Sequence, residues 1–103
     1  MHNSKIADQN TDFLFQAILK LENMDECYAF FEDLCTVPEI KALAQRIVVA
    51  KMLTEDKVYN EIAALTGAST ATISRVKRSL KYGCDGYTEI FNRLDNAKAP
   101  EES

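Results

Sequence analysis

A cationic stretch, residues 67–84, carries the side chains best suited to bind an anionic polymer. Its basic residues, with no acid among them, are Arg75, Lys77, Arg78 and Lys81. Ammonium and guanidinium groups that bind phosphates give affinity that falls steeply with salt, but little choice of base sequence. We therefore predict phosphate contacts with double-stranded DNA at Ser74, Lys77, Arg78 and Lys81. For Lys77, Arg78 and Lys81 the alternative is a solvated basic face.

Small polar residues come just before these cations. Hydroxyl groups can donate to or accept from base edges, and the methyl groups of alanine and threonine can touch the thymine methyl. The start of a helix also favours a nearby phosphate, because its free amides point outward. The predicted base-reading residues are Ser69, Thr70, Ala71, Thr72 and Arg75.

Two short helices must position these side chains. Residues 58–66 have a helical apolar pattern that ends at Gly67, a residue tolerant of positive φ, and Ser69 or Thr70 can cap a second helix that ends near Tyr82. Ala63 is small enough for a close crossing, and a shared core is available from Ile62, Ile73 and Val76. The pattern predicts a helix-turn-helix over residues 58–82. The alternative is an ordinary helical hairpin whose glycine only caps.

The flanking segments are also predicted to be helical. Thr36 and Glu39 have the spacing of a capping box, so a long central helix and its joint are expected over 36–57. An aromatic-rich hairpin over 11–35, with Thr11 as its first N-cap, needs more core than a short chain supplies and therefore predicts a partner subunit. We expect an all-α fold of about six helices in a single domain over 1–96, with a last helix over 87–95 and a disordered tail over 97–103.

Charge is unevenly distributed along the chain. The 103 residues have a formal net charge of −4, yet residues 41–84 carry a net +5 while residues 1–40 carry −6. Clustered positive charge matters more for nucleic-acid binding than the total. No run of about 18 apolar residues suggests a membrane span, and no signal peptide is visible. We expect a cytoplasmic protein without a membrane partner.

Catalytic and metal chemistry lack suitable residues. His2 is the only histidine, and there is no glycine-rich phosphate loop or paired carboxylate site. Cys27, Cys35 and Cys84 are too few and too far apart for a zinc site or a disulfide framework, and we interpret them as small apolar core residues. We predict that the protein is not an enzyme and has no metal and no cofactor.

Residues 34–81 resemble the DNA-binding half of the tryptophan repressor family, and most of all its YerC/YecD-type relatives. The matching segments are Thr36 to Glu39, Ala42-Leu43, Gln45-Arg46, Gly67-Ala68, residues 71–75 and residues 79–81. The resemblance implies an intertwined homodimer whose N-terminal helices wrap around the partner. It also implies a transcriptional repressor that binds palindromic operators in adjacent major grooves.

One position departs from that family. The resemblance places a candidate ligand pocket for tryptophan at Arg46, Arg75, Val76 and Ser79. The family has glycine where this chain has Val76, and a branched side chain there takes the space of the indole ring. We therefore predict that tryptophan is not a corepressor. Arg75 is then expected to contact DNA and Arg46 to make a structural or phosphate contact, a surface ion pair being the alternative for both.

Two other functions stay open at this point. The helix-turn-helix could serve as a protein–protein interaction module whose acidic flanks attract a basic partner. It could also belong to a DNA-binding regulator controlled by an unidentified small ligand in a remodelled pocket near Arg46.

Overall fold

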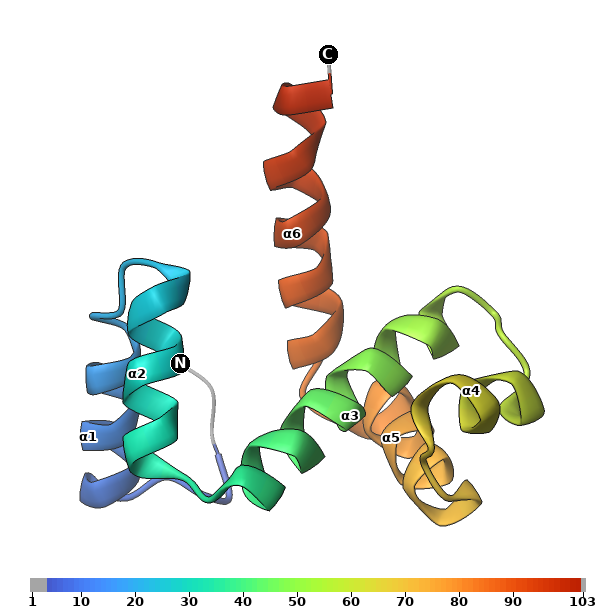
Figure 1. Ribbon diagram of the computed structural model, residues 1–103, viewed down its shortest axis with the longest axis horizontal. Helices are drawn as coiled ribbons and strands as arrows, with labels where there is room; N and C mark the ends of the chain where they lie inside the picture. The colour runs from blue at the N-terminus through green and yellow to red at the C-terminus, as the bar shows by residue number, and fades with distance from the viewer. Residues whose placement is uncertain (1–3, 103) are drawn as a thin grey trace. The chain divides into compact units, whose positions relative to one another are not determined.

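The computed structural model describes residues 4–102, with side chains described to residue 97. In this part of the chain there are six α-helices and no strand (Figure 1), as the sequence predicts. Their bounds are α1 (Gln9–Ile18), α2 (Met24–Leu34), α3 (Val37–Thr54), α4 (Tyr59–Thr66), α5 (Thr70–Tyr82) and α6 (Gly86–Glu102). The chain divides into two compact units, one ending at Val37 and the other beginning at Pro38. This division within one copy differs from the single domain expected over 1–96.

The first unit consists of α1 and α2, each capped by an acceptor side chain. Asp8 accepts from the backbone N–H of Thr11 at 2.7 Å, and this hydrogen bond lowers the pKa of the Asp8 carboxyl. Thr11, predicted as the N-cap, therefore lies inside the helix, because the carboxylate three residues earlier is the acceptor. Asn23 caps α2 through the N–H of Glu26 at 2.9 Å.

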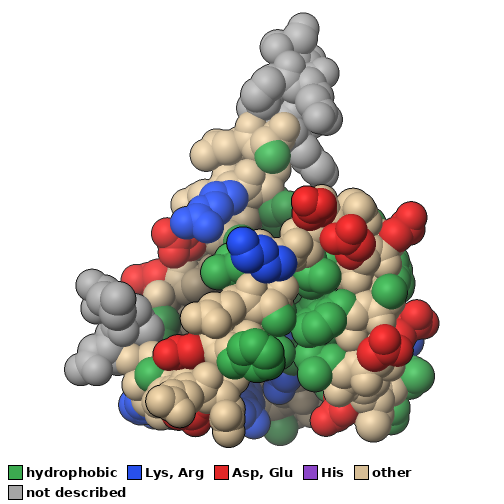
Figure 2. Space-filling view, turned by 90° about the vertical axis from the view of Figure 1, so that its left-hand side faces the viewer, with side chains coloured by type: hydrophobic (Ala, Val, Ile, Leu, Met, Phe, Trp, Pro, Cys, Tyr) green, Lys and Arg blue, Asp and Glu red, His purple; other side chains and the backbone are tan. Residues whose placement is uncertain are grey.

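Apolar side chains of this hairpin lie at the surface. Neither α1 nor α2 has a buried residue; Phe13 is 73% exposed and Tyr28 66%. Phe30 and Phe31 pack edge to face, with ring centroids 5.5 Å apart. Figure 2 shows hydrophobic side chains exposed at the molecular surface beside acidic ones. The hairpin thus lacks a closed core of its own.

The second unit, in contrast, has a hydrophobic core made by α3, α5 and α6 together with α4 and the turn after it. The buried residues are Val49, Ala50, Ile62, Ala68, Ile73, Val76 and Phe91. Burial of branched side chains such as these is the main favourable term in folding a small domain. Of the three shared-core residues predicted for the helix-turn-helix, all three are buried.

The N-terminal half of helix α6 packs against α3. The ammonium of Lys51 lies 5.2 Å from the Phe91 ring centroid and 3.8 Å from a carboxylate oxygen of Asp95. The C-terminal boundary predicted at residue 95 is wrong, because α6 continues to Glu102 through most of the tail expected to be disordered. No glycine follows Gly86 to end the helix. Ser103 lies outside the described residues.

No helix of the described chain is both long enough and apolar enough to cross a bilayer.

Candidate nucleic-acid interface

The turn between α4 and α5 has the backbone conformation that the sequence predicts. Gly67 adopts φ 73°, and its N–H donates to the carbonyl of Ala63 at 2.9 Å, which ends α4. Ala68 is buried directly after it, and α5 begins two residues later. The two helices are therefore joined tightly, and α4 packs against α5.

Side-chain hydrogen bonds hold this turn from two sides. Thr66 donates to the carbonyl of Ile62 at 2.7 Å and accepts from the N–H of Ala68 at 3.1 Å. From α3, the Gln45 amide donates to the carbonyl of Thr66 at 3.1 Å. Carbonyls at a helix C-terminus lack intrahelical partners, so this bond supplies one. Sequence reasoning did not assign Gln45 this role, because the contact joins two helices far apart in the chain.

The predicted base-reading residues at the start of α5 differ in their hydrogen bonds and exposure. Ser69 is the N-cap: its hydroxyl accepts from the N–H of Thr72 and donates to the Thr72 hydroxyl, each at 3.1 Å. Thr72 is half-buried. Thr70, Ala71 and Arg75 are exposed. The structure therefore leaves the last three open to a partner, while the hydroxyls of Ser69 and Thr72 are engaged with each other.

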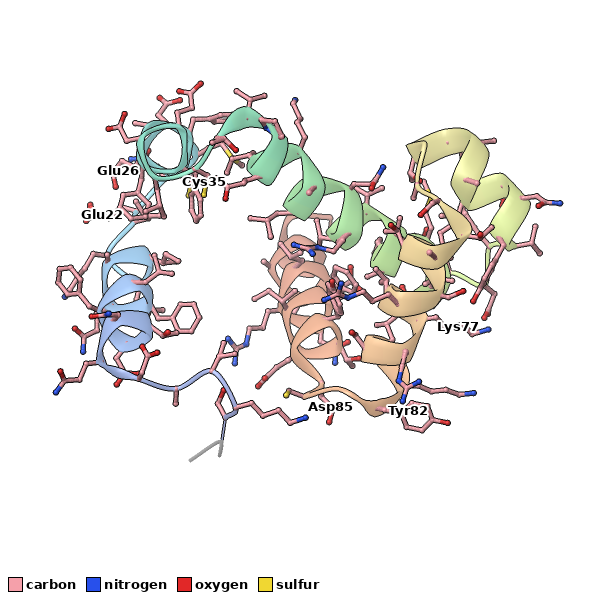
Figure 3. All side chains as sticks on the ribbon, turned by 90° about the horizontal axis from the view of Figure 1, so that it is seen from below. Glu22, Glu26, Cys35, Lys77, Tyr82 and Asp85 are labelled. Carbon is pink, nitrogen blue, oxygen red and sulfur yellow. The ribbon has the colours of Figure 1, made fainter. Side chains whose placement is uncertain are left out.

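A cationic surface covers the outward side of α5. We use this name for the residues that line one shallow hollow there, namely Ser74, Arg75, Lys77, Arg78, Lys81 and Tyr82. All of them are exposed, so the structure brings together all four predicted phosphate contacts. Tyr82, 77% exposed, was missed in the sequence, although it follows Arg78 by four residues and so shares its helix face. Figure 3 shows Lys77 and Tyr82 projecting away from the helices.

One cation of this surface has an aromatic neighbour on the preceding helix. The ammonium of Lys77 lies 5.5 Å from the ring centroid of Tyr59, the first residue of α4. Tyr59 is half-buried and packs against the core. The contact crosses from α5 to α4, so the side-chain position of Lys77 depends on both helices.

The candidate ligand-pocket residues have different surroundings in the structure. Arg75 lines the cationic surface, while Ser79 lines a separate hollow with Gly83, Cys84, Gly86 and Tyr87. Val76 is 2% exposed and belongs to the core, and Arg46 on α3 is half-buried. The valine therefore fills space inside the second unit.

The cysteines offer no ligand cluster. Cys27 and Cys35 are half-buried and Cys84 is exposed, so the prediction that all three are core residues is wrong. Cys84 follows the end of α5, in the turn to α6, where a side chain faces solvent. Among the residues whose positions are described, no group of three histidine, cysteine or acidic residues could hold a metal ion.

Comparison with known proteins identifies the family. A family model described as Trp repressor protein matches residues 9–95. The chain belongs to this family. It is 48% identical over 103 residues to the uncharacterized protein YerC of Bacillus subtilis (strain 168), covering 100% of this chain and 99% of YerC.

Two solved structures have the same fold. A TrpR-like protein from Eubacterium eligens superposes with a TM-score of 0.86 at 59% identity, covering 90% of this chain and 96% of that one. A putative Trp repressor from Staphylococcus aureus gives a TM-score of 0.85 at 56% identity, covering 88% and 91%. These likenesses confirm the predicted TrpR-like fold and place the chain in a family of helix-turn-helix regulators.

Proposed function

We propose that this member of the Trp repressor family binds double-stranded DNA sequence-specifically and acts as a transcriptional repressor. The observation that carries the proposal is the exposed face of α5, on which Thr70, Ala71 and Arg75 are open at one end and the cationic surface continues to Tyr82. Such a helix can enter the major groove with its first residues at base edges and its stem beside phosphates. A regulator of this kind acts where the chromosome is, in the bacterial cytoplasm.

Charge supports DNA over a basic protein as the partner of this face. Every charged side chain that lines the hollow on α5 is positive. Residues 1–40 carry a net charge of −6 and would be repelled by a duplex, so the cationic surface is the part of the chain that electrostatics favours for DNA contact. An interaction module for a basic protein would need the opposite sign on this face.

A homodimer is part of the proposal. The exposed apolar side chains of α1 and α2, such as Phe13 and Tyr28, would be covered by a second copy. Two copies of α5 related by a twofold axis would sit about 34 Å apart, one turn of the duplex, on a palindromic operator. Sedimentation of the purified protein tests this, and a monomer at all concentrations would contradict it.

Tryptophan is not the corepressor in this proposal. Val76 is already packed in the core at the position where the family leaves room for the indole ring. Hydrogen bonds from Gln45 and Thr66 hold the turn before α5, so the protein itself supplies the groups that fix this turn. Calorimetry with L-tryptophan should show no binding; micromolar affinity would contradict this part of the proposal.

Selection of bound sequences from a random DNA pool tests the main proposal. We expect an enriched inverted repeat whose half-sites lie one helical turn apart. Replacing one phosphate-binding lysine, Lys81→Ala, removes one contact from each copy of the proposed dimer and should make the slope of log affinity against log salt shallower by about 1.8, or about 0.9 per copy. The matched control is Lys20→Ala, which removes an exposed lysine outside α5 and should leave the slope unchanged. No enrichment, together with a salt-insensitive protein partner in pull-downs, would favour an interaction module instead.

A further inference from the structure

We infer that Tyr59 is a positioning residue for DNA binding, holding the Lys77 ammonium ready for a backbone phosphate at the α4 edge of the reading helix. The inference rests on the proposed function and adds a residue from the first helix of the helix-turn-helix. Its basis is the contact between the two side chains, 5.5 Å from ammonium to ring centroid.

The position of Lys77 on α5 differs from that of Arg78. Lys77 follows the buried Ile73 by four residues, so it lies at the margin of the buried face. Arg78 follows Ala71 by seven residues and Ser74 by four, which places these three exposed residues on one outward row. Lys77 therefore flanks that row on one side of the helix.

Tyr59 is suited to act as a rigid platform. It is half-buried and packs on the core, so its ring has little freedom to move. A lysine side chain is long and loses rotamer freedom when its ammonium is fixed by a phosphate. The ring face attracts the cation before DNA arrives, and this reduces the freedom still to be lost on binding.

The contact leaves the ammonium able to bind an anion. An ammonium has three N–H donors, and an aromatic face takes up only the side that points to it. Lys77 is exposed, so donors on the far side can reach a phosphate oxygen. Among the described residues no aromatic ring face lies against the ammonium of Lys81, which makes Lys81 the matched comparison.

A double-mutant cycle tests the coupling. The probe is a fluorescein-labelled mixed-sequence duplex of about 30 base pairs, long enough for two half-sites one turn apart. Tyr59→Leu should weaken binding by about two- to fivefold per half-site, the range expected for one exposed cation–π contact, whereas Tyr59→Phe keeps the ring and should stay near wild type. In a Lys77→Ala background Tyr59→Leu should have no further effect, but in a Lys81→Ala background it should keep its full effect.

Several outcomes would overturn the inference. If Tyr59→Leu lowers DNA affinity equally in the Lys77→Ala and Lys81→Ala backgrounds, Tyr59 acts independently of Lys77. Tighter binding by Tyr59→Leu would mean that the ring withholds Lys77 from DNA. In both cases wild-type protein still binds, so the proposed function survives; absence of wild-type binding would overturn both proposals.

Two further measurements separate positioning from folding. Thermal unfolding identifies variants that have lost the fold. If Tyr59→Leu does not fold, Tyr59→Met replaces it in the cycle, because methionine also removes the ring while filling similar space. In the wild type, the ε-methylene protons of Lys77 should be shifted upfield by the ring current, and Tyr59→Leu should abolish the shift. Unshifted protons in the folded wild type would overturn the inference by themselves.

Discussion

The N-terminal hairpin and the helix-turn-helix unit use hydrophobic residues in opposite ways. Neither α1 nor α2 buries a side chain, and Phe13, Phe15 and Tyr28 are exposed. Among its described side chains the second unit buries seven, and it keeps polar and cationic side chains on the outward face of α5. Exposed apolar patches mark interaction surfaces. The second unit has a buried core of its own, whereas the hairpin leaves its apolar side chains exposed, as the proposed homodimer requires.

Core truncation should show the largest contrast. Ile73 is fully buried, and Ile73→Ala should lower the free energy of unfolding by about 2–5 kcal/mol, because a cavity remains. Thr70→Ala on the same helix removes an exposed side chain and should change it by less than about 0.5 kcal/mol. Urea unfolding measures both. Similar losses from the two variants would contradict a closed core in the second unit.

The hairpin should respond through association. If a second copy covers Phe13, Phe13→Ala should weaken dimerisation by about 1.5–3 kcal/mol per side chain, the value for burying a large apolar group. Gln16→Ala, another exposed residue of α1, is the control. Sedimentation equilibrium gives both dissociation constants. Unchanged dimerisation in Phe13→Ala would remove this residue from the interface.

The end of α5 should tolerate no side chain at Gly83. A Cβ there would collide with the carbonyl oxygen of Ser79, which is backbone and cannot move aside cheaply. Gly83→Ala should therefore cost about 1–3 kcal/mol, as other overpacked sites do. Gly86→Ala, where nothing lies within 4 Å, should be close to neutral. Equal unfolding free energies for the two variants would argue against this turn geometry.

Gly67 should show a smaller and purely conformational effect. Its φ of 73° is left-handed, and a Cβ at this position would meet no atom within 4 Å, so only backbone strain opposes a side chain. Gly67→Ala should cost about 1–2 kcal/mol of stability. Because the turn sets the angle of α5, DNA affinity should fall as well. Retained stability with a normal turn would contradict the assigned conformation.

The smallest expected effect is a pH dependence at the start of α1. The hydrogen bonds from Thr11 lower the pKa of Asp8 below its ordinary 3.8. The stability that the Asp8 cap contributes is therefore fully present above pH 3.8, the ordinary pKa of the carboxyl. It is lost as the pH falls through the pKa of Asp8 in the folded state, which is lower. Asp8→Asn keeps an acceptor but does not titrate. NMR titration of the Asp8 carboxyl measures the midpoint, and a value at or above 3.8 would refute the cap.

Local sequence patterns predicted the structure of the helix-turn-helix well. The glycine of the turn, the serine cap of α5 and the three buried core residues follow from backbone conformation, hydrogen bonding and helical spacing within a short stretch. Boundaries were less accurate: α1 begins earlier because Asp8 caps it, and α6 runs on to Glu102. Tyr82 could have been found from its spacing to Arg78, since both lie on one face of one helix.

The sequence by itself determined the all-α class, the helix-turn-helix and the side chains that α5 presents, because each depends on residues within a few turns of one another. Only the tertiary structure decided that Gln45 holds the end of α4, that Lys51 lies against Phe91 and that Lys77 lies over Tyr59. These contacts join residues on different helices. Their existence depends on how the helices pack, and a periodic pattern along one chain does not specify that.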